Sequence, residues 1–267
     1  MFKVSCIQIC SGKDIKKNLN ISKKLILKAI KQKSDFIITP ETSSLFGLNK
    51  KQLLQTATVM EKDIYLKGIQ ELAKRYKKWI LTCVLIKEKN KIRNRSVLIN
   101  SKGLIVTYYD KIHMYDAVLS QKEKYFESKT FIAGTSLKTA DLPWGKLGLS
   151  ICYDVRFPNM FRKLSQEGSL FISVPSAFAE TTGKKHWHSL LKARAIENFC
   201  FIFAPAQYGT HWNKRKTYGH SLIVSPDGQI LKELKKRTGF ITANIDPNIS
   251  KILRKKIPSL NKTSDEI

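Results

Sequence analysis

Short apolar runs alternate with amphipathic segments along most of the chain. Between residues 14 and 33, isoleucine and leucine recur at roughly helical spacing with lysines between them, and this pattern predicts a helix. Residues 35–39 instead form a short run rich in isoleucine that ends at Pro40, which indicates a buried strand. The same contrast predicts further helices at residues 61–78, 158–167 and 186–198, and further strands at 2–9, 79–86, 146–152, 170–175, 199–206, 219–224 and 239–245.

Turn residues join some of the strands directly. Ser101-Lys102-Gly103 joins residues 95–100 to 104–109, and Pro226-Asp227-Gly228 lies between the last two predicted strands. Strands that alternate with helices indicate a layered α/β fold, while hairpins indicate mixed sheets. No internal repeat and no Pro/Gly/Ser-rich linker divides the chain. We therefore expect one domain over residues 1–267, with a basic tail from about residue 249 to 267 on the surface or against a partner subunit.

The composition is that of an ordinary globular protein, with 267 residues, 42% hydrophobic and 26% charged. The longest nearly apolar run, residues 199–206, is far too short to cross a bilayer. The first residues enter a strand pattern at once and show no apolar segment followed by a cleavage site. Five cysteines without paired spacing do not form a disulfide framework. These features predict a cytoplasmic protein with reduced thiols and no membrane partner.

The formal net charge of +27 is the unusual feature of the composition. Of the 48 basic residues, 39 are lysines, and they are spread over the whole chain rather than gathered in one segment. Nucleic-acid-binding proteins normally concentrate arginine and aromatic residues at a contact face. The distribution therefore favours a solvated lysine-rich surface over a specific nucleic-acid site. Such a surface can still speed the approach of a small anionic molecule.

Several kinds of catalytic site are excluded by missing motifs. The chain has no Gly-rich phosphate loop, no cysteine pair at zinc-binding spacing and no Gly-x-Ser-x-Gly sequence. His186 and His188 lie two residues apart near a predicted helix start, so they diverge around the helix instead of sharing a face. We therefore expect no metal and no cofactor. Metal-free cysteine chemistry remains open.

Three predicted strands end in residues that can perform that chemistry. Glu41 follows the strand at residues 35–39, Lys111 follows the strand at 104–109, and Cys152 ends the strand at 146–152. Reactive side chains of α/β folds typically project from the carboxyl ends of strands. A carboxylate, an ammonium and a thiol together suit acyl transfer, in which the carboxylate accepts the thiol proton, the sulfur attacks, and the ammonium stabilises the oxyanion.

These three residues and their neighbours resemble the Glu-Lys-Cys triad of the nitrilase superfamily, the carbon–nitrogen hydrolases. The family's signature blocks are matched in order by Pro40-Glu41, Asp110-Lys111-Ile112-His113 and Cys152-Tyr153-Asp154-Val155-Arg156-Phe157-Pro158. The resemblance implies a four-layer α-β-β-α sandwich with two mixed sheets, usually as a homodimer or higher homo-oligomer. It also implies that Glu127, in Lys124-Tyr125-Phe126-Glu127-Ser128, is a supporting glutamate that orients Lys111 or the attacking water.

Within the superfamily, the chain is most similar to the branch of deaminated glutathione amidases and ω-amidases. This similarity is carried by Thr181-Thr182-Gly183, His186-Trp187, residues 193–198, residues 206–211 and Tyr218-Gly219-His220-Ser221. It implies a metabolite-repair amidase that uses water to cleave a linear amide of a small carboxylated substrate through a cysteine thioester, releasing ammonia and a carboxylic acid. The sequence departs from the family at Glu41-Thr42-Ser43 and at the basic loop 212–216, which leaves the substrate open.

Substrate contacts are expected from three further residues. The N–H of Tyr153 joins Lys111 in holding the oxyanion. A carboxylated substrate needs basic donors, for which Arg156 and Arg194 are the candidates. Each has an alternative role, since Arg156 can brace the elbow after Cys152 through Asp154, and Arg194 can form a helix-face ion pair with Glu197.

Other functions compete with this interpretation. The same catalytic residues serve nitrile and carbamoyl hydrolysis. A Cys–His hydrolase would instead activate Cys152 through His188 or His220, and a non-enzymatic protein would use its basic surface to bind nucleic acid or an acidic partner. His113 and His220 are otherwise expected to be structural hydrogen-bonding residues.

Overall fold

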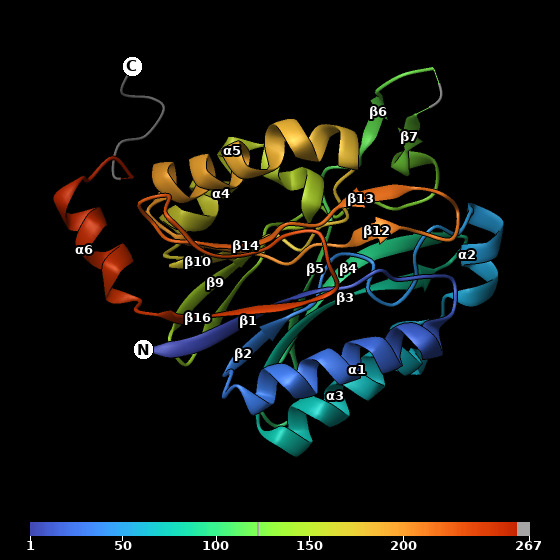
Figure 1. The fold of residues 1–267 in the computed structure, drawn as a ribbon, viewed down its shortest axis with the longest axis horizontal. Helices are drawn as coiled ribbons and strands as arrows, with labels where there is room; N and C mark the ends of the chain where they lie inside the picture. The colour runs from blue at the N-terminus through green and yellow to red at the C-terminus, as the bar shows by residue number, and fades with distance from the viewer. Residues whose placement is uncertain (122, 261–267) are drawn as a thin grey trace.

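Two six-stranded β-sheets pack face to face between two layers of helices in the computed structural model, which describes residues 1–121 and 123–260 (Figure 1). This arrangement confirms the expected four-layer α-β-β-α sandwich. The expected basic tail is described only as far as residue 260, and its last seven residues lie outside the described part of the chain.

The first sheet joins the two ends of the chain. Its strand order is β16-β1-β2-β3-β4-β5. β1 runs antiparallel to β16, with Phe2 opposite Ile245 and Gln8 opposite Gly239, whereas β1, β2 and β3 are mutually parallel. The strands are β1 (Phe2–Gln8), β2 (Phe36–Ile38), β3 (Trp79–Glu88), β4 (Lys91–Ile99), β5 (Ile105–Asp110) and β16 (Gly239–Ile245).

The second sheet has the order β15-β14-β11-β10-β9-β8. Its three central strands, β9, β10 and β11, are parallel, and its outer strands are antiparallel to their neighbours. Both sheets are therefore mixed, as the hairpins in the sequence predicted. The strands are β8 (Thr139–Leu142), β9 (Gly145–Leu149), β10 (Phe171–Ser173), β11 (Phe201–Ala204), β14 (Ser221–Val224) and β15 (Ile230–Leu234).

Amphipathic helices cover the outer face of each sheet. α1 (Ile15–Lys31) and α3 (Ile64–Tyr76) lie on the first sheet, and α4 (Pro158–Gln166) and α5 (Glu180–Asn198) lie on the second (Figure 1). α1 begins where Asp14 accepts hydrogen bonds from the backbone N–H groups of Lys16 and Lys17, as expected of an N-cap aspartate. α5 begins six residues earlier than predicted, directly after a pocket-lining segment.

Short elements escaped prediction. They are the strands β8 and β15 of the second sheet, α2 (Lys50–Thr56), α6 (Asn248–Lys256), the ribbons β6 (Asp116–Val118) with β7 (Lys124–Phe126) and β12 (Tyr208–Thr210) with β13 (Lys216–Tyr218), and the 3-10 helices η1 (Met60–Lys62), η2 (Glu127–Lys129) and η3 (Cys152–Arg156). α6 forms within the segment expected to be a surface tail. Three-residue strands and single helical turns are too short to show a period of hydrophobic residues.

The main core fills the space between the sheets, where aromatic side chains from both sheets interlock. Phe171 and Phe203 stack at 5.6 Å between ring centroids, and Phe36 of the opposite sheet meets Phe203 edge-on. A second core lies between the first sheet and its helices, and includes Ile7, Ile37 and Ile69.

Among the described residues, no helix is both long enough and apolar enough to span a membrane.

Candidate active site

The three predicted strand ends come together: Glu41 and Cys152 line one cavity, and Lys111 is bonded to Glu41. Glu41 follows β2 and Lys111 follows β5 of the first sheet, while Cys152 follows β9 of the second. All three residues are buried, with 2%, 1% and 8% of their surfaces exposed. Charged groups are rarely buried to this extent unless they are paired, so the neighbours of each group decide what it can do.

The carboxylate of Glu41 is held by donors from three directions. Its Oε1 accepts hydrogen bonds from Lys111 Nζ at 2.9 Å and from Asn94 Nδ2 at 2.8 Å, and its Oε2 accepts one from the backbone N–H of Ala177 at 2.8 Å. The Cys152 thiol is near enough to this carboxylate to lower its pKa. The carboxylate is therefore fixed beside the thiol, where a general base must lie.

Lys111 lies between two carboxylates. Its ammonium donates to Glu41 and, at 2.7 Å, to Oε2 of Glu127, which also accepts from the backbone N–H of Tyr115. An ammonium has three N–H donors, and these contacts with described residues use two of them. A further donor can point at a developing oxyanion in the cavity.

Cys152 begins the 3-10 helix η3 with a positive φ of 50°, a strained conformation for a residue other than glycine. Its backbone N–H donates to the carbonyl of Pro175 at 3.0 Å. The fully buried Asp154 fixes the turn, because its carboxylate accepts from the Tyr109 hydroxyl and from the backbone N–H groups of Ile151 and His113. The elbow that presents the thiol is thus built by hydrogen bonds around Asp154.

The protonation states follow from burial and charge together. Burial raises the pKa of Glu41, but Lys111 and the surrounding donors outweigh this effect and hold that pKa below its usual value. Burial lowers the pKa of Lys111, but Glu127 and Glu41 raise it well above its usual range. Burial and the Glu41 carboxylate both raise the pKa of Cys152 well above that of a free thiol. At neutral pH Cys152 is therefore a thiol, Lys111 an ammonium and Glu41 a carboxylate.

The cavity beside the thiol is tight, with a free volume of about 10 Å³, roughly the room for one water molecule. Arg215 lines both this cavity and an outer hollow beside it, which also contains Lys124, Lys214, Lys216, Glu123 and Glu180. The cavity is lined by Glu41, Tyr115, Glu127, Cys152, Tyr153, Arg156, Ala177, Phe178, Ala179, Thr182 and Arg215. Only a small group can lie against the thiol, and Arg156 and Arg215 are the basic residues of the lining.

Two of the three predicted substrate-binding residues reach the cavity. Tyr153 and Arg156 line it, and the N–H of Tyr153 lies in the first turn of a helix, where backbone donors have no partner within that helix. Arg156 hydrogen-bonds to His186 at 3.1 Å. The alternative role for Arg156 was to brace the elbow through Asp154. That carboxylate is bonded instead by Tyr109, Ile151 and His113.

Arg194 is not brought to the cavity, contrary to its predicted substrate contact. Its guanidinium donates to the carbonyl of Val155 at 2.8 Å and to Glu197 at 2.8 Å. It therefore supports the elbow from behind, and the expected helix-face ion pair is present. The α5 period places Arg194 toward η3, on the side away from the thiol.

Three functional groups of the cavity were missed by sequence reasoning. Asn94 lies inside β4 rather than at a strand end, and the backbone N–H of Ala177 carries no side-chain signal. Arg215 belongs to the basic loop that was noted as a possible wall of the pocket. Its Nε is buried without a partner among the described residues, while its NH2 donates to the carbonyl of Ala177. Only the period-2 alternation of β4 could have placed Asn94 on the inner face.

The competing Cys–His arrangement finds no support in this geometry. His188 and His220 do not line the cavity, and both contact Glu233 instead. His113 contacts Asp154, in keeping with its expected structural role. Among the described residues, the acid–base partner beside the thiol is Glu41.

Comparison with known proteins agrees with the fold and identifies the family. The sequence profile of the carbon–nitrogen hydrolase family matches residues 3–253. A deaminated glutathione amidase of the cyanobacterium Synechocystis is 36% identical over 265 residues, covering 97% of each chain. The Caenorhabditis elegans NitFhit protein superposes with a TM-score of 0.92 at 34% identity, over 99% of this chain and 65% of that one. Saccharomyces cerevisiae Nit3, a member of the nitrilase superfamily, superposes with a TM-score of 0.88 at 25% identity, over 100% and 97%.

Proposed function

Because the chain belongs to the carbon–nitrogen hydrolase family, whose members break C–N bonds of amides, we propose that Glu41, Lys111 and Cys152 hydrolyse a small carboxylated amide through a thioester. The observation that carries this assignment is the hydrogen-bonded row Glu127–Lys111–Glu41 lying against the thiol. It combines a base, an oxyanion donor and a nucleophile in one buried cavity.

Acylation starts from the protonated thiol. Since the pKa of Cys152 is raised and that of Glu41 is lowered, a resting thiolate is disfavoured, and proton transfer to Glu41 accompanies the attack of Sγ on the amide carbon. The carbonyl oxygen becomes an oxyanion held by Lys111 and the N–H of Tyr153. Glu41 then protonates the nitrogen, the C–N bond breaks, and the acyl group remains on sulfur as a thioester.

Deacylation repeats the sequence with water. Glu41, again a carboxylate, takes a proton from water as the oxygen attacks the thioester carbon. The new oxyanion accepts hydrogen bonds from the same donors, Lys111 and the N–H of Tyr153. Collapse breaks the C–S bond, the proton returns to sulfur, and the carboxylic acid leaves. Glu127 acts by keeping Lys111 charged and in place.

The substrate class follows from the cavity and its basic entrance. The inner cavity is tight, so the remainder of a larger substrate must extend into the outer hollow. Arg215 stands between the two, held over the rings of Phe46 and Tyr125, with its Nε free of partners among the described residues. A buried donor without a partner is satisfied by a ligand acceptor, and a carboxylate suits guanidinium best.

Deaminated glutathione, the substrate in the name of the Synechocystis relative, fits this description. Its chemistry corrects one part of the expected reaction, because this compound has no primary carboxamide. Hydrolysis of its γ-amide releases the amine of a cysteinylglycine dipeptide rather than ammonia. Ammonia is the product only for primary amides such as α-ketoglutaramate.

A substrate panel tests the proposal. Purified protein is given deaminated glutathione, α-ketoglutaramate, a carbamoyl amino acid and a simple nitrile, and release of both free amine and ammonia is measured. We expect the highest kcat/KM for deaminated glutathione, loss of turnover in Cys152→Ala, and a KM raised about tenfold or more in Arg215→Gln with kcat less affected. Turnover that survives in Cys152→Ala would contradict the mechanism, whereas preference for another substrate would contradict only the proposed acyl group.

Three further expectations remain part of the proposal. One is a single functional domain over residues 1–267, and another is a homodimer or larger homo-oligomer, which light scattering after gel filtration measures. The third is residence in the cytoplasm. All five cysteines are free thiols, which suits a reducing compartment.

A further inference from the structure

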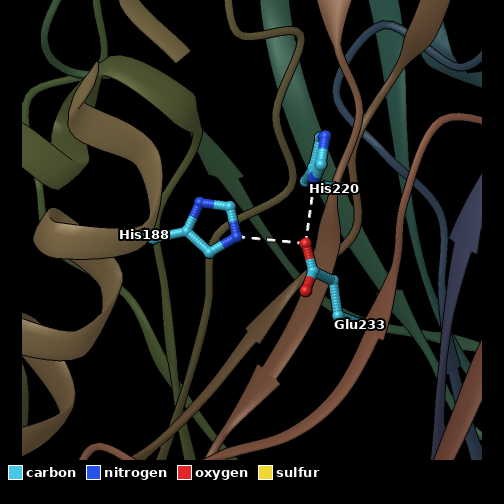
Figure 2. Close-up of side chains that lie close together, drawn as sticks. All are labelled: His188, His220 and Glu233. Carbon is cyan, nitrogen blue, oxygen red and sulfur yellow. Dashed lines mark hydrogen bonds and ion pairs between the residues drawn. The ribbon is translucent and has the colours of Figure 1, made fainter. Parts of the chain in front are cut away.

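Outside the cavity, two histidines and a glutamate converge from three separate elements (Figure 2). His188 comes from α5, His220 from the turn between β13 and β14, and Glu233 from β15. Nε2 of His188 lies 3.1 Å from Oε1 of Glu233, and Nδ1 of His220 lies 2.6 Å from the same oxygen. The sequence predicted no metal site because the three residues are far apart along the chain: Glu233 lies 45 positions after His188 and 13 positions after His220.

The backbone around this cluster is held firmly. His220 has a positive φ of 55°, and its carbonyl accepts a hydrogen bond from Trp187 Nε1 at 2.8 Å. Its ring stacks on Tyr218 with 4.2 Å between centroids. α5 approaches β13 closely because Gly183 has no side chain, and a Cβ there would lie 2.5 Å from Tyr218. Side chains set by such packing are suited to an exacting geometry.

The donor set is one that zinc binds, and its atoms lie close enough together for small side-chain adjustments to bring them onto one ion. Zinc binds imidazole nitrogen and carboxylate oxygen at about 2.0–2.2 Å, so tetrahedral ligand atoms lie roughly 3.3 Å apart. The three donor atoms here all lie within 4.8 Å of one another. Side-chain exposures of 32%, 11% and 23% for His188, His220 and Glu233 leave room for an ion to enter and for water to fill a fourth position.

We propose that His188, His220 and Glu233 form a site for a divalent transition metal ion, with zinc as the reference ligand. Two neutral imidazoles and one carboxylate favour zinc, copper, nickel or cobalt over magnesium or calcium, which prefer all-oxygen sites. The net charge of +27 repels any cation, so binding depends on coordination by these ligands rather than on the general field. A bound ion would tie α5 to β15 and the β13–β14 turn.

Zinc titration of the Cys152→Ala protein tests the site, because this background removes the thiol that zinc could otherwise bind in the cavity. Calorimetry and thermal unfolding are recorded for metal-free protein with added zinc chloride. Glu233→Gln and His188→Gln each remove one ligand. His186→Gln, two residues away, is the matched histidine control. Cys10→Ala removes a second zinc-prone pair, since Cys10 Sγ lies 3.6 Å from His211 Nδ1.

We expect one zinc ion per chain, a raised Tm on zinc addition, and an affinity at least roughly tenfold weaker in both ligand variants but unchanged in His186→Gln and Cys10→Ala. Cobalt substitution should give absorption bands without sulfur-to-cobalt charge transfer. Absence of saturable binding, an affinity in Glu233→Gln equal to that of the parent, or binding lost in Cys10→Ala would each overturn the proposal. Thermal unfolding of each variant without metal shows whether that variant is folded. Loss of the zinc site can then be distinguished from loss of the fold.

Discussion

β4 and the end of β5 carry two clusters of charged side chains, one on each face of the sheet. The clusters contain similar groups but differ in their surroundings. On the inner face, Asn94 and Lys111 contact Glu41 in a fully buried cavity. On the outer face, Arg95 forms two hydrogen bonds with Asp110, at 2.7 and 2.9 Å, near solvent. Neighbouring residues along one strand thus serve opposite faces, as the period-2 geometry of a strand requires.

The two clusters differ in what their charges face more than in burial, because the side chains of Arg95 and Asp110 are 9% and 14% exposed and that of Glu127 is 17% exposed. Arg95 also packs on the ring of Tyr108 at 3.8 Å, so the outer pair is a brace for the sheet edge. The inner charges have little water to solvate them and depend on each other. Ionic groups of the same kind therefore stabilise the sheet edge on the outer face, and those on the inner face are available for chemistry. Four measurements address this contrast.

Removing the inner ammonium should have the largest effect. Lys111→Ala deletes an oxyanion donor, which is typically worth about 3–4 kcal/mol, and leaves Glu41 beside Glu127 without a countercharge. We expect kcat to fall by at least about 10²–10³-fold in steady-state assays. Lys111→Gln, which keeps much of the side-chain volume, should show a similar loss in a folded protein. Near-normal turnover in Lys111→Gln would contradict the assigned role.

His211 shows what happens to a buried titratable group that has no acidic partner. Its Nδ1 donates to the carbonyl of Ser11 and its Nε2 accepts from Thr217, so the ring is neutral, and burial lowers its pKa to about 4. Below pH 6.5 the unfolded chain takes up a proton that the folded chain excludes. Stability should therefore fall as the pH drops from about 6.5 to about 4, by roughly 3 kcal/mol in total.

Urea unfolding at a series of pH values measures this loss in the free energy of unfolding. His211→Gln can keep a donor and an acceptor but does not titrate. Its stability should change less with pH across that window than that of the parent protein. Parallel curves for the two proteins would show that His211 is not the group responsible.

Glu127→Gln exchanges the inner supporting carboxylate for an amide of nearly the same shape. A charge-assisted hydrogen bond is worth about 1.5–3 kcal/mol, so kcat should fall about 10–100-fold while the cavity stays packed. The rate of thioester formation, measured in single turnover, distinguishes slowed acylation from slowed product release. An unchanged rate of acylation would contradict the proposed role of Glu127 in supporting Lys111.

Asp110→Asn makes the same chemical change on the outer face and is the matched control. It weakens a mostly buried pair with Arg95, whose charge-assisted hydrogen bonds are worth about 1.5–3 kcal/mol. We expect a lower denaturation midpoint and a kcat within about twofold of the parent. A catalytic loss as large as that of Glu127→Gln would mean that the two faces are not separate.

The regular parts of this architecture were predictable because they repeat. Long helices such as α1 and α3 carry several turns of apolar spacing, and strands of the core are short apolar runs bounded by turn residues. The ribbon β6–β7 and helix α2 were missed because three to seven residues hold too little pattern. α6 was assigned to a polar tail because its basic composition masked its spacing.

The candidate site was predictable only where chemistry coincided with a strand end. Glu41, Lys111 and Cys152 stood out because a solvated surface does not explain them. Asn94 and the backbone N–H of Ala177 depend on register and on which sheets face each other, and these are tertiary properties. Arg194 was wrongly predicted to contact substrate. The sequence of a helix does not show whether its buried face meets the cavity or the elbow beside it.

The pairing of β1 with β16 has a consequence for how the protein is made. Seven residues near the start of the chain must pair with seven that emerge from the ribosome roughly 230 residues later, about 10–50 s at ordinary elongation rates. During that interval β1 is an edge strand with unpaired backbone groups and apolar side chains, a form prone to association with other chains. Translation speed and chaperone cover of the nascent N-terminus therefore set the yield of folded enzyme.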